Sequence, residues 1–451
     1  MTRAELLRAL QRPPLEEVEA DPQVLARTEK LFGRPLTPAQ AVDEIVDSVA
    51  RGGDEALLAW VRRIDGLELT PSELFVSEDE WEAAYRHVKA PDLEAIRTAC
   101  EHIRAFHRRQ VPRDWMMSGP GGSILGQRYL PVERAGVYVP GGRAPLASSA
   151  LMGVVPASLA GVEDIIVATP ARPDKTVDPH VLVAAREAGA HRVLRVGGAQ
   201  AIAALAYGTE TVPRVDKIVG PGNLFVALAQ RRVFGRVGIE SLPGPSEVLI
   251  IADDTADPDW VAADLLSQAE HDPDAAAWLL TPSEACAEAT AAAVERQLAE
   301  LPHPDTAAAS WRRWGAIVVC RDLDEAVELA NAIAPEHLEL MIADPWRRLP
   351  DIRNAGAVFL GAAATEPIGD YIAGPNHVLP TNGAARFASA LGVESFLKRS
   401  SVIAYTGDGV AVTGPAAVRL ARLEGLEAHA RAVERRLGGT GSQAKGGTAH
   451  G

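Results

Sequence analysis

Cysteine and aromatic residues are scarce in this sequence, which limits the kind of protein that it can encode. Among 451 residues there are 3 cysteines, and only 5% of the residues are aromatic. Cys100, Cys286 and Cys320 are far apart and form no CxxC unit, so we expect reduced, buried thiols of a cytoplasmic protein rather than one disulfide and a free thiol. Because large rings are few, small apolar side chains, chiefly Ala and Val, must fill the core.

The sequence also lacks an excess of positive charge and a continuous membrane span. A formal net charge of −15 and a pI near 5.3 oppose binding to nucleic acid or to an anionic membrane, so neither partner is expected. The first 14 residues contain no apolar core of a signal peptide. The uncharged run 144–162 has the length of a span, but Pro145, Pro156 and its serines make it too polar and too broken. A buried loop and helix are expected there instead.

Alternation of short apolar runs with helical segments predicts the fold class. The length suggests two to four domains. Strands are predicted at residues 136–140, 164–169, 192–196, 217–220, 247–252, 276–281, 316–320, 338–343 and 357–360, with helices between most of them. This order predicts an α/β fold with two successive doubly wound blocks, each with a parallel sheet and helices on both faces.

The two ends of the chain are predicted to be helical. Thr37, Pro38 and Gln40 form a capping-box start, and the helix that follows is expected to end at Gly52 and Gly53. His87, His102 and His107 have charged neighbours on the N-terminal helices and are expected to be solvated. The last seventy or so residues are expected to be helical up to a disordered Gly-, Ser- and Thr-rich tail at 438–451.

No complete phosphate-binding fingerprint follows any predicted strand. GxGxxG and GxxxxGK[ST] are both missing. Glycine turns at 119–122, 141–142, 197–198 and 220–222 would still let the backbone approach a pyrophosphate. Each turn alone is a weak signal, since any α/β sheet needs such turns. Together they mildly favour a nucleotide or phosphate ligand.

Asp370 and His377 lie in a stretch that is rich in turn residues and poor in charge. Gly and Pro at 369, 374, 375, 380 and 383 interrupt any helical or strand periodicity, so both side chains are expected on loop backbone. Two isolated polar groups in such a loop are typical of a buried or half-buried site. A solvated surface loop, with Asp370 capping a turn, is an equally open interpretation at this point.

Three further polar groups could carry chemistry. Gln268 and His271 are three residues apart at the end of a predicted helix, which is metal-type spacing, although a His favoured by the helix dipole explains the helix equally well. Glu336 and His337 precede a predicted strand and suit acid-base work, or form a helix-end charge pair. His429 shares a helical face with apolar residues, which indicates either a core position or contact with an oligomer partner.

Several longer strings resemble the histidinol dehydrogenase family, from about residue 25 to residue 435. The most specific strings are SQAEHD from Ser267, APEHLEL from Ala334, GDYIAGPNHVLPTNGAARF from Gly369 and EGLEAHA from Glu424, with GVYVPGG from Gly136, VGGAQAIAALAYG from Val196, VGPGN from Val219 and PGPSEVLIIAD from Pro243. The resemblance implies an oxidoreductase of histidine biosynthesis, an amino-acid biosynthesis pathway. Its members oxidise L-histidinol through L-histidinaldehyde to L-histidine with two NAD.

The resemblance also implies an architecture. The fold would be two incomplete Rossmann-like domains with small helical extensions, in a cytoplasmic homodimer with shared active sites. The expected parts are an N-terminal helical extension (1–24), a first α/β domain with the metal and catalytic site (25–133 and 242–382), a second α/β domain that binds NAD (134–241), a C-terminal extension that reaches the partner subunit (383–437), and the tail.

Site residues carry over position by position. One zinc ion per subunit would be held by Gln268, His271, Asp370 and, from the other subunit, His429. Glu336 would activate water and His337 would help to remove protons. Histidinol would be contacted by Ser148, Ser246, Gln268, His271, His337, Asp370, His377, Glu424 and His429, and NAD by Tyr138, Gln200 and Asn223. No cysteine lies in a matching motif, so attack by water is expected rather than a covalent thiohemiacetal. The same acids and histidines could also serve a zinc hydrolase.

Overall fold

The computed structural model describes residues 10, 22–141, 146–241 and 244–439. These residues form two compact units. One comprises Met1–Gln110 and Val132–Phe396, and the other comprises Val111–Pro131 and Leu397–Gly451. None of the described helices combines the length and the apolar character of a membrane span. Cys100, Cys286 and Cys320 are free and buried, as expected.

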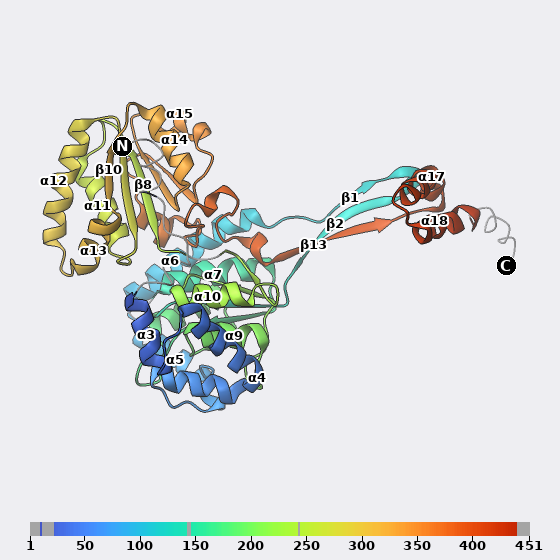
Figure 1. Cartoon of the computed structure of the whole chain (residues 1–451), viewed down its shortest axis with the longest axis horizontal. Coiled ribbons are helices and arrows are strands. Elements are labelled where there is room, and N and C mark those ends of the chain that lie inside the picture. Colours follow the sequence, from blue (N-terminus) through green and yellow to red (C-terminus); the bar gives the residue numbers. More distant parts are fainter. Residues whose placement is uncertain (1–9, 11–21, 142–145, 242–243, 440–451) are drawn as a thin grey trace. The chain divides into compact units, whose positions relative to one another are not determined.

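The first unit contains two parallel five-stranded sheets, as the alternating pattern predicts (Figure 1). The first sheet has the order β5-β4-β3-β6-β7. Its strands are β3 (Arg134–Tyr138), β4 (Asp164–Ala168), β5 (Arg192–Leu194), β6 (Lys217–Val219) and β7 (Gly238–Ile239), and its helices are α7 (Ala147–Ala160), α8 (Pro179–Ala188), α9 (Gly198–Tyr207) and α10 (Leu224–Val233).

Alternate residues of these strands enter opposite cores. Val137 and Val167 pack with α7 and α8, whereas Tyr138 and Ile166 pack with α9 and α10. Successive side chains of a strand point to opposite faces, so an apolar run in a parallel sheet fills both layers. The sheet is therefore covered on both faces.

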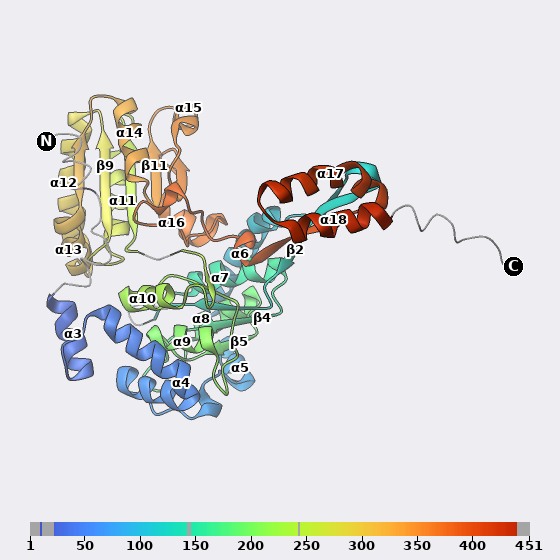
Figure 2. The same ribbon diagram turned by 45° about the vertical axis from the view of Figure 1, so that its right-hand side comes forward.

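The N-terminal helices are α3 (Pro22–Phe32), α4 (Pro38–Asp65), α5 (Glu78–His87) and α6 (Ala90–His107). The capping box of Thr37 and Gln40 is confirmed, but α4 does not end at the glycine pair; it continues through a kink at Gly53, whose φ is 53°. The prediction that His107 is solvated is wrong, because this residue is fully buried. These helices share their cores with the first sheet, α3 and α4 on one face and α5 and α6 on the other (Figure 2). Their packing differs from the predicted division, which joined residues 25–133 to the block of residues 242–382.

The second sheet has the order β10-β9-β8-β11-β12 and is also parallel. Its strands are β8 (Glu247–Ala252), β9 (Ala276–Thr281), β10 (Ala316–Val319), β11 (His337–Met341) and β12 (Ala357–Leu360). Helices α11 (Pro258–Ala269), α12 (Glu284–Glu300) and α13 (Asp305–Trp314) lie on one side of this sheet, and α14 (Leu323–Ile333) and α15 (Pro345–Arg348) lie on the other (Figure 1).

The second unit corrects the expectation that the last seventy residues are helical. β13 (Leu397–Ala404) pairs antiparallel with β2 (Ile124–Pro131), which also pairs with β1 (Trp115–Ser118). The hydrogen-bond partners of β13 come from a segment more than 260 residues earlier, so local periodicity could not reveal them. Helices α17 (Gly407–Leu423) and α18 (Glu427–Gly439) complete the unit. Most of the predicted N-terminal extension and the predicted tail after residue 439 lie outside the described residues.

Candidate active site

The polar residues of the predicted site gather at the amino ends of two neighbouring strands. Glu247 begins β8 and His337 begins β11, and His337 pairs with Val248 in the sheet. A crossover helix of a parallel sheet runs antiparallel to the strands, so α11 brings Gln268 back to this same edge. His271 lies just beyond the end of α11 rather than in its last turn, and its backbone N–H donates to the carbonyl of Gln268 (3.3 Å).

Glu336 and His337 are both buried and lie side by side. The Glu336 carboxylate accepts a hydrogen bond from the backbone N–H of Glu247 (2.8 Å) and lies 3.7 Å from His337 Nδ1. Burial raises the pKa of Glu336 to about 8, against the opposing effect of His337. Burial disfavours the charged imidazole, but the negative charges of Glu336 and Asp370 outweigh it and hold the pKa of His337 well above its ordinary value. The pair therefore holds at least one proton at neutral pH.

Asp370 lies close to both His337 and His377. The side chains of Asp370 and His377 are each 13% exposed, which agrees with a half-buried site and not with a solvated loop. Asp370 lies 3.5 Å from His337 Nε2 and 3.8 Å from His377 Nδ1. Burial opposes ionisation of Asp370, but its interactions with these two nearby histidines outweigh it and lower its pKa. The expectation that Asp370 lies on loop backbone is wrong. Asp370 lies in a π-helical turn, Gly369–Ala373, that follows the short helix α16 (Glu366–Ile368).

Glu366 was not singled out from the sequence, and the structure places it in the middle of the site. It is 1% exposed, and its carboxylate lies 3.9 Å from His271 Nε2. The hydrogen-bonding groups around Gln268 decide which of its amide atoms is the nitrogen and which is the oxygen. The nitrogen donates to both Glu366 oxygens (2.7 and 3.0 Å), and the oxygen accepts from the N–H of Glu247 (3.2 Å). Burial raises the pKa of Glu366 to about 7. The feature of the sequence that could have indicated Glu366 as a site residue is its position four residues before Asp370.

The donor set suits a divalent metal ion. His271, Glu366 and Asp370 each bring one ligand atom within 4.8 Å of the other two. An imidazole nitrogen and two carboxylate oxygens are donors that zinc accepts, and the amide of Gln268 lies next to Glu366. The residues of this edge could therefore hold zinc.

The predicted NAD contacts lie at the first sheet. Tyr138 ends β3, and its hydroxyl oxygen accepts a hydrogen bond from the N–H of Gly198 (3.1 Å). Gln200 is fully buried on α9 and donates to Asp65 (3.3 Å). Asn223 is the N-cap of α10 and accepts from the N–H groups of the first turn (3.1 and 3.2 Å). Tyr138 is thus joined to the glycine turn at 197–198, which Gln200 follows in sequence, while Asn223 lies after a different glycine turn.

The remaining predicted residues are distributed over three segments. Ser148 lies in the first turn of α7, and Ser246 immediately precedes β8. Glu424 follows α17 and His429 lies on α18, both in the second unit. The structure therefore brings together Gln268, His271, Glu336, His337, Asp370 and His377, and leaves Glu424 and His429 in the other unit.

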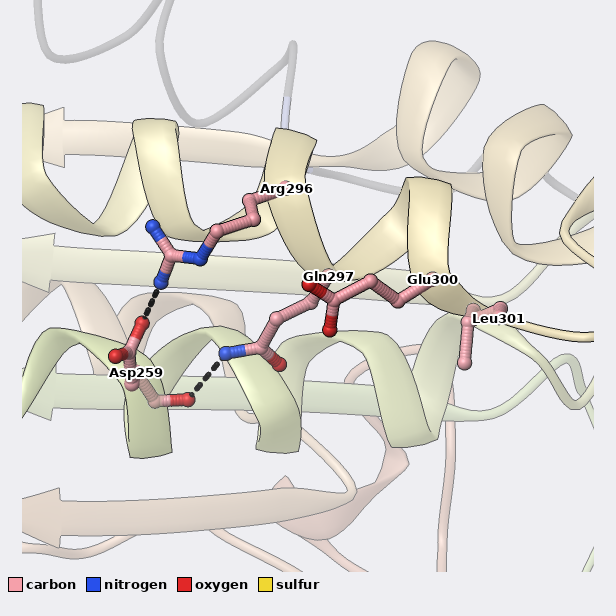
Figure 3. A pocket seen from close by; sticks show the side chains of 5 residues that line it. All are labelled: Asp259, Arg296, Gln297, Glu300 and Leu301. Carbon is pink, nitrogen blue, oxygen red and sulfur yellow. Dashed lines mark hydrogen bonds and ion pairs between the residues drawn. The ribbon is translucent and has the colours of Figure 1, made fainter.

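A recess at the opposite end of α11 has no part in this constellation. It measures about 360 Å³ and is lined by Asp259 of α11 and by residues 296, 297, 300 and 301 at the end of α12. Figure 3 shows Arg296 and Gln297 hydrogen-bonded to Asp259 across it. None of the predicted site residues lines the recess.

Comparison with known proteins identifies close relatives. Residues 36–437 match the family described as histidinol dehydrogenase. The chain is 54% identical over 396 residues to a histidinol dehydrogenase of Thermosynechococcus vestitus, covering 88% of this chain and 92% of the relative. It is 53% identical to that of Halalkalibacterium halodurans, covering 88% and 93%. The crystal structure of histidinol dehydrogenase from Elizabethkingia anophelis is similar, with a TM-score of 0.88 at 35% identity over 98% of both chains.

Proposed function

Because the chain belongs to the histidinol dehydrogenase family of NAD-dependent oxidoreductases, we propose that the edge formed by β8, β11 and α11 oxidises L-histidinol through L-histidinaldehyde to L-histidine, with two NAD consumed in succession. One observation supports this assignment above the others. His337 lies 3.7 Å from Glu336 on one side and 3.5 Å from Asp370 on the other, at the edge where His271 also lies. A substrate bound there would meet proton acceptors and metal ligands at once.

We assign zinc binding to Gln268, whose amide would turn its oxygen from the Glu247 N–H toward the metal, to His271 and to Asp370, with His429 of the partner subunit as the fourth ligand. Zinc would act as a Lewis acid that orients and polarises the substrate. Since zinc has no redox role, the hydride passes to NAD. Glu366 contributes a buried negative charge beside Gln268 and His271, which favours a cation at this place.

The proton chemistry falls to His337 and Glu336. In the first oxidation the deprotonated imidazole of His337 would accept the hydroxyl proton of histidinol, and bound NAD would accept the carbon-bound hydride. In the second oxidation Glu336 would take a proton from the water that attacks the aldehyde, and the hydrate anion so formed would give its one carbon-bound hydride to a second NAD and leave as the carboxylic acid. Ser148, Ser246 and His377 would hold the substrate, joined by Glu424 and His429 of the partner subunit.

The cofactor would lie at the first sheet, against Tyr138, Gln200 and Asn223. The N-terminus of α10, which Asn223 caps, follows the glycine turn at 220–222, where backbone N–H groups can face a pyrophosphate. The absence of a complete GxGxxG fingerprint agrees with an incomplete Rossmann-like domain.

We also propose a homodimer, which the place of Glu424 and His429 in the second unit supports. The second unit is small, yet it exposes many large apolar side chains: Trp115, Met116, Met117, Ile124, Ile403, Val412, Leu420, Leu423 and Leu426. Exposed apolar surface on this scale is typical of an interface. We propose that this unit binds a second copy of the chain and delivers Glu424 and His429 to its active site, in a cytoplasmic enzyme.

The test is direct. Purified protein is mixed with histidinol, NAD and zinc, and NADH is followed by its absorbance. Two NADH per histidinol are expected, with histidine as the product. No NADH, or only one per histidinol, would contradict the two-step oxidation. Hydrolysis of an amide in the absence of NAD would instead support a zinc hydrolase.

A further inference from the structure

Helix α7 carries a proline in its interior, and this proline leaves one carbonyl without its helical partner. Pro156 lies within Ala147–Ala160. In an α-helix the N–H of residue 156 would donate to the carbonyl of residue 152, but proline has no N–H. The carbonyl of Met152 is therefore open to another donor, although Met152 itself is fully buried. A buried carbonyl without a donor is costly, so a partner is expected.

Asn376 supplies that donor from the segment that follows Asp370. Its amide nitrogen donates to the Met152 carbonyl at 2.8 Å, and its amide oxygen accepts from the N–H of Val378 at 2.9 Å. The residue is 5% exposed. The nitrogen also lies 3.4 Å from Nε2 of His107, whose Nδ1 lies 2.9 Å from the carbonyl of Ile103. The amide is thus fixed on both its donor and its acceptor side.

A second attachment on α6 holds the same segment. Nδ1 of His102 lies 2.8 Å from the carbonyl of Ile372. Gly374 approaches the backbone of α6 so closely that an added Cβ would lie 2.8 Å from the His102 carbonyl, and its φ of +109° excludes most side chains. Residues 372–378 are therefore fastened to helices α6 and α7, which cover the first sheet, while Asp370, the neighbour of His377, faces His337 of the second sheet.

His377 is the residue whose position this attachment decides. It lies between Asn376 and Val378, the two residues that the Asn376 side chain connects. Its Nδ1 lies 3.8 Å from Asp370, and its Nε2 is buried without a hydrogen-bond partner among the described residues. A buried nitrogen in this state is ready to meet a ligand.

We propose that Asn376 is a positioning residue for substrate binding, matched to the carbonyl that Pro156 leaves open, and that it places Nε2 of His377 toward histidinol. This inference rests on the proposed function, since it assumes that His377 contacts the substrate. It predicts that Asn376 and Pro156 act as a pair: the amide is needed because the proline is there.

The test compares Asn376→Ala, Pro156→Ala and the double variant in the histidinol and NAD assay. Asn376→Ala should raise KM for histidinol by about tenfold or more, the effect of leaving a buried partner unpaired, while KM for NAD stays within about twofold. Pro156→Ala restores the helical N–H, so in its background the effect of Asn376→Ala on KM for histidinol should shrink by about threefold or more. Asn331→Ala is the matched control, because the amide of Asn331, like that of Asn376, donates to one backbone carbonyl and accepts from backbone N–H groups.

Each outcome decides the inference. An unchanged KM for histidinol, equal increases in both KM values, or two effects that simply multiply would overturn the pairing of Asn376 and Pro156 while leaving the proposed function intact. A wild-type protein that forms no NADH would contradict the proposed function instead. If Asn376→Ala does not fold, the isosteric Asn376→Asp takes its place, with the same expected loss and the same dependence on Pro156.

Discussion

Nε2 of His337 lies 3.5 Å from a carboxylate oxygen of Asp370, while Nδ1 of the same ring lies 3.0 Å from the backbone carbonyl of Glu247. A carbonyl only accepts, so Nδ1 carries a hydrogen and Nε2 is the nitrogen that can gain or lose a proton. Asp370 stabilises the protonated ring and orients it. The backbone carbonyl of Glu247, at the start of β8, thus sets the tautomer of His337, at the start of β11.

Replacing Glu336 with Gln should separate the two oxidations. The variant keeps the size of the side chain but removes the base that activates water. We expect the aldehyde step to slow by about a hundredfold or more, in the range of general-base effects, and the alcohol step by less than about tenfold. Single-turnover measurement of NADH should then approach one NADH per histidinol. Glu288→Gln, on the exposed surface of α12, is the control; an equal loss in both steps would argue against a role for Glu336 in water activation.

The pKa of Glu336 also predicts a pH profile. Burial raises this pKa to about 8, and only the deprotonated carboxylate can accept a proton from water. The rate of aldehyde oxidation should therefore rise with pH through the region around 8 and level off above it. The assay starts from histidinaldehyde and NAD between pH 6 and pH 10. In Glu336→Gln this rise should disappear, and its persistence there would assign it to another group.

Much of the fold could be predicted because its signals are local. The nine predicted strands all occur, since each is an apolar run bounded by Gly or Pro, and Thr37 with Gln40 caps α4 as predicted. β13 was missed because its partner β2 is remote in sequence. The burial of His107 was missed for a related reason. Its neighbours in sequence are charged, and the groups that bury it, including Asn376, come from the other end of the chain.

The site was predicted through motifs, and Glu366 shows where motifs are insufficient. In sequence Glu366 is one acid among many, preceding a proline and a glycine. Its importance lies in three-dimensional contacts with Gln268 and His271, which α11 brings to it. For Glu424 and His429, contacts within one chain do not define the proposed role. They lie in the second unit, and their role depends on another copy of the chain.

Glu366→Gln should weaken zinc binding. The substitution removes a buried negative charge next to Gln268 and His271 and leaves the volume nearly unchanged. We expect about a tenfold or larger loss of zinc affinity, the range reported for groups that support metal ligands. Competition with a chromophoric chelator measures it without reference to activity. Glu288→Gln should bind zinc as the wild type does, and an unchanged affinity of Glu366→Gln would remove Glu366 from the metal site.

The shared site predicts complementation between inactive variants. His271→Asn and His429→Asn each lack one proposed ligand, and in a mixed dimer one of the two sites would recover both histidines. After mixing and reassociation we expect up to about a quarter of the wild-type activity, because half of the dimers are mixed and each holds one intact site. Subunit exchange is confirmed separately with labelled chains. If exchange occurs and no activity returns, the two histidines do not belong to one site made from two subunits.

Glu339 offers a test of how buried carboxyl groups set the stability of this edge. It is 1% exposed on β11, and its carboxylate accepts from the backbone N–H of Glu366 (2.9 Å). Burial, followed by the negative charge of Asp264, holds its pKa well above the ordinary value. A carboxyl group with a raised pKa in the folded state stabilises the fold at pH values below its unfolded pKa of about 4.3, and that stabilisation is lost as pH rises toward the folded value.

Glu339→Gln should remove this loss, because an amide can still accept from the Glu366 N–H and never ionises. The melting temperature of the wild type should therefore fall more between pH 6 and pH 9 than that of the variant, by about 2 °C or more. Glu288→Gln, which changes an exposed carboxylate, should follow the wild type at every pH. Parallel curves for wild type and Glu339→Gln would mean that Glu339 is already ionised in the folded protein at pH 6, and would contradict a pKa raised into this range.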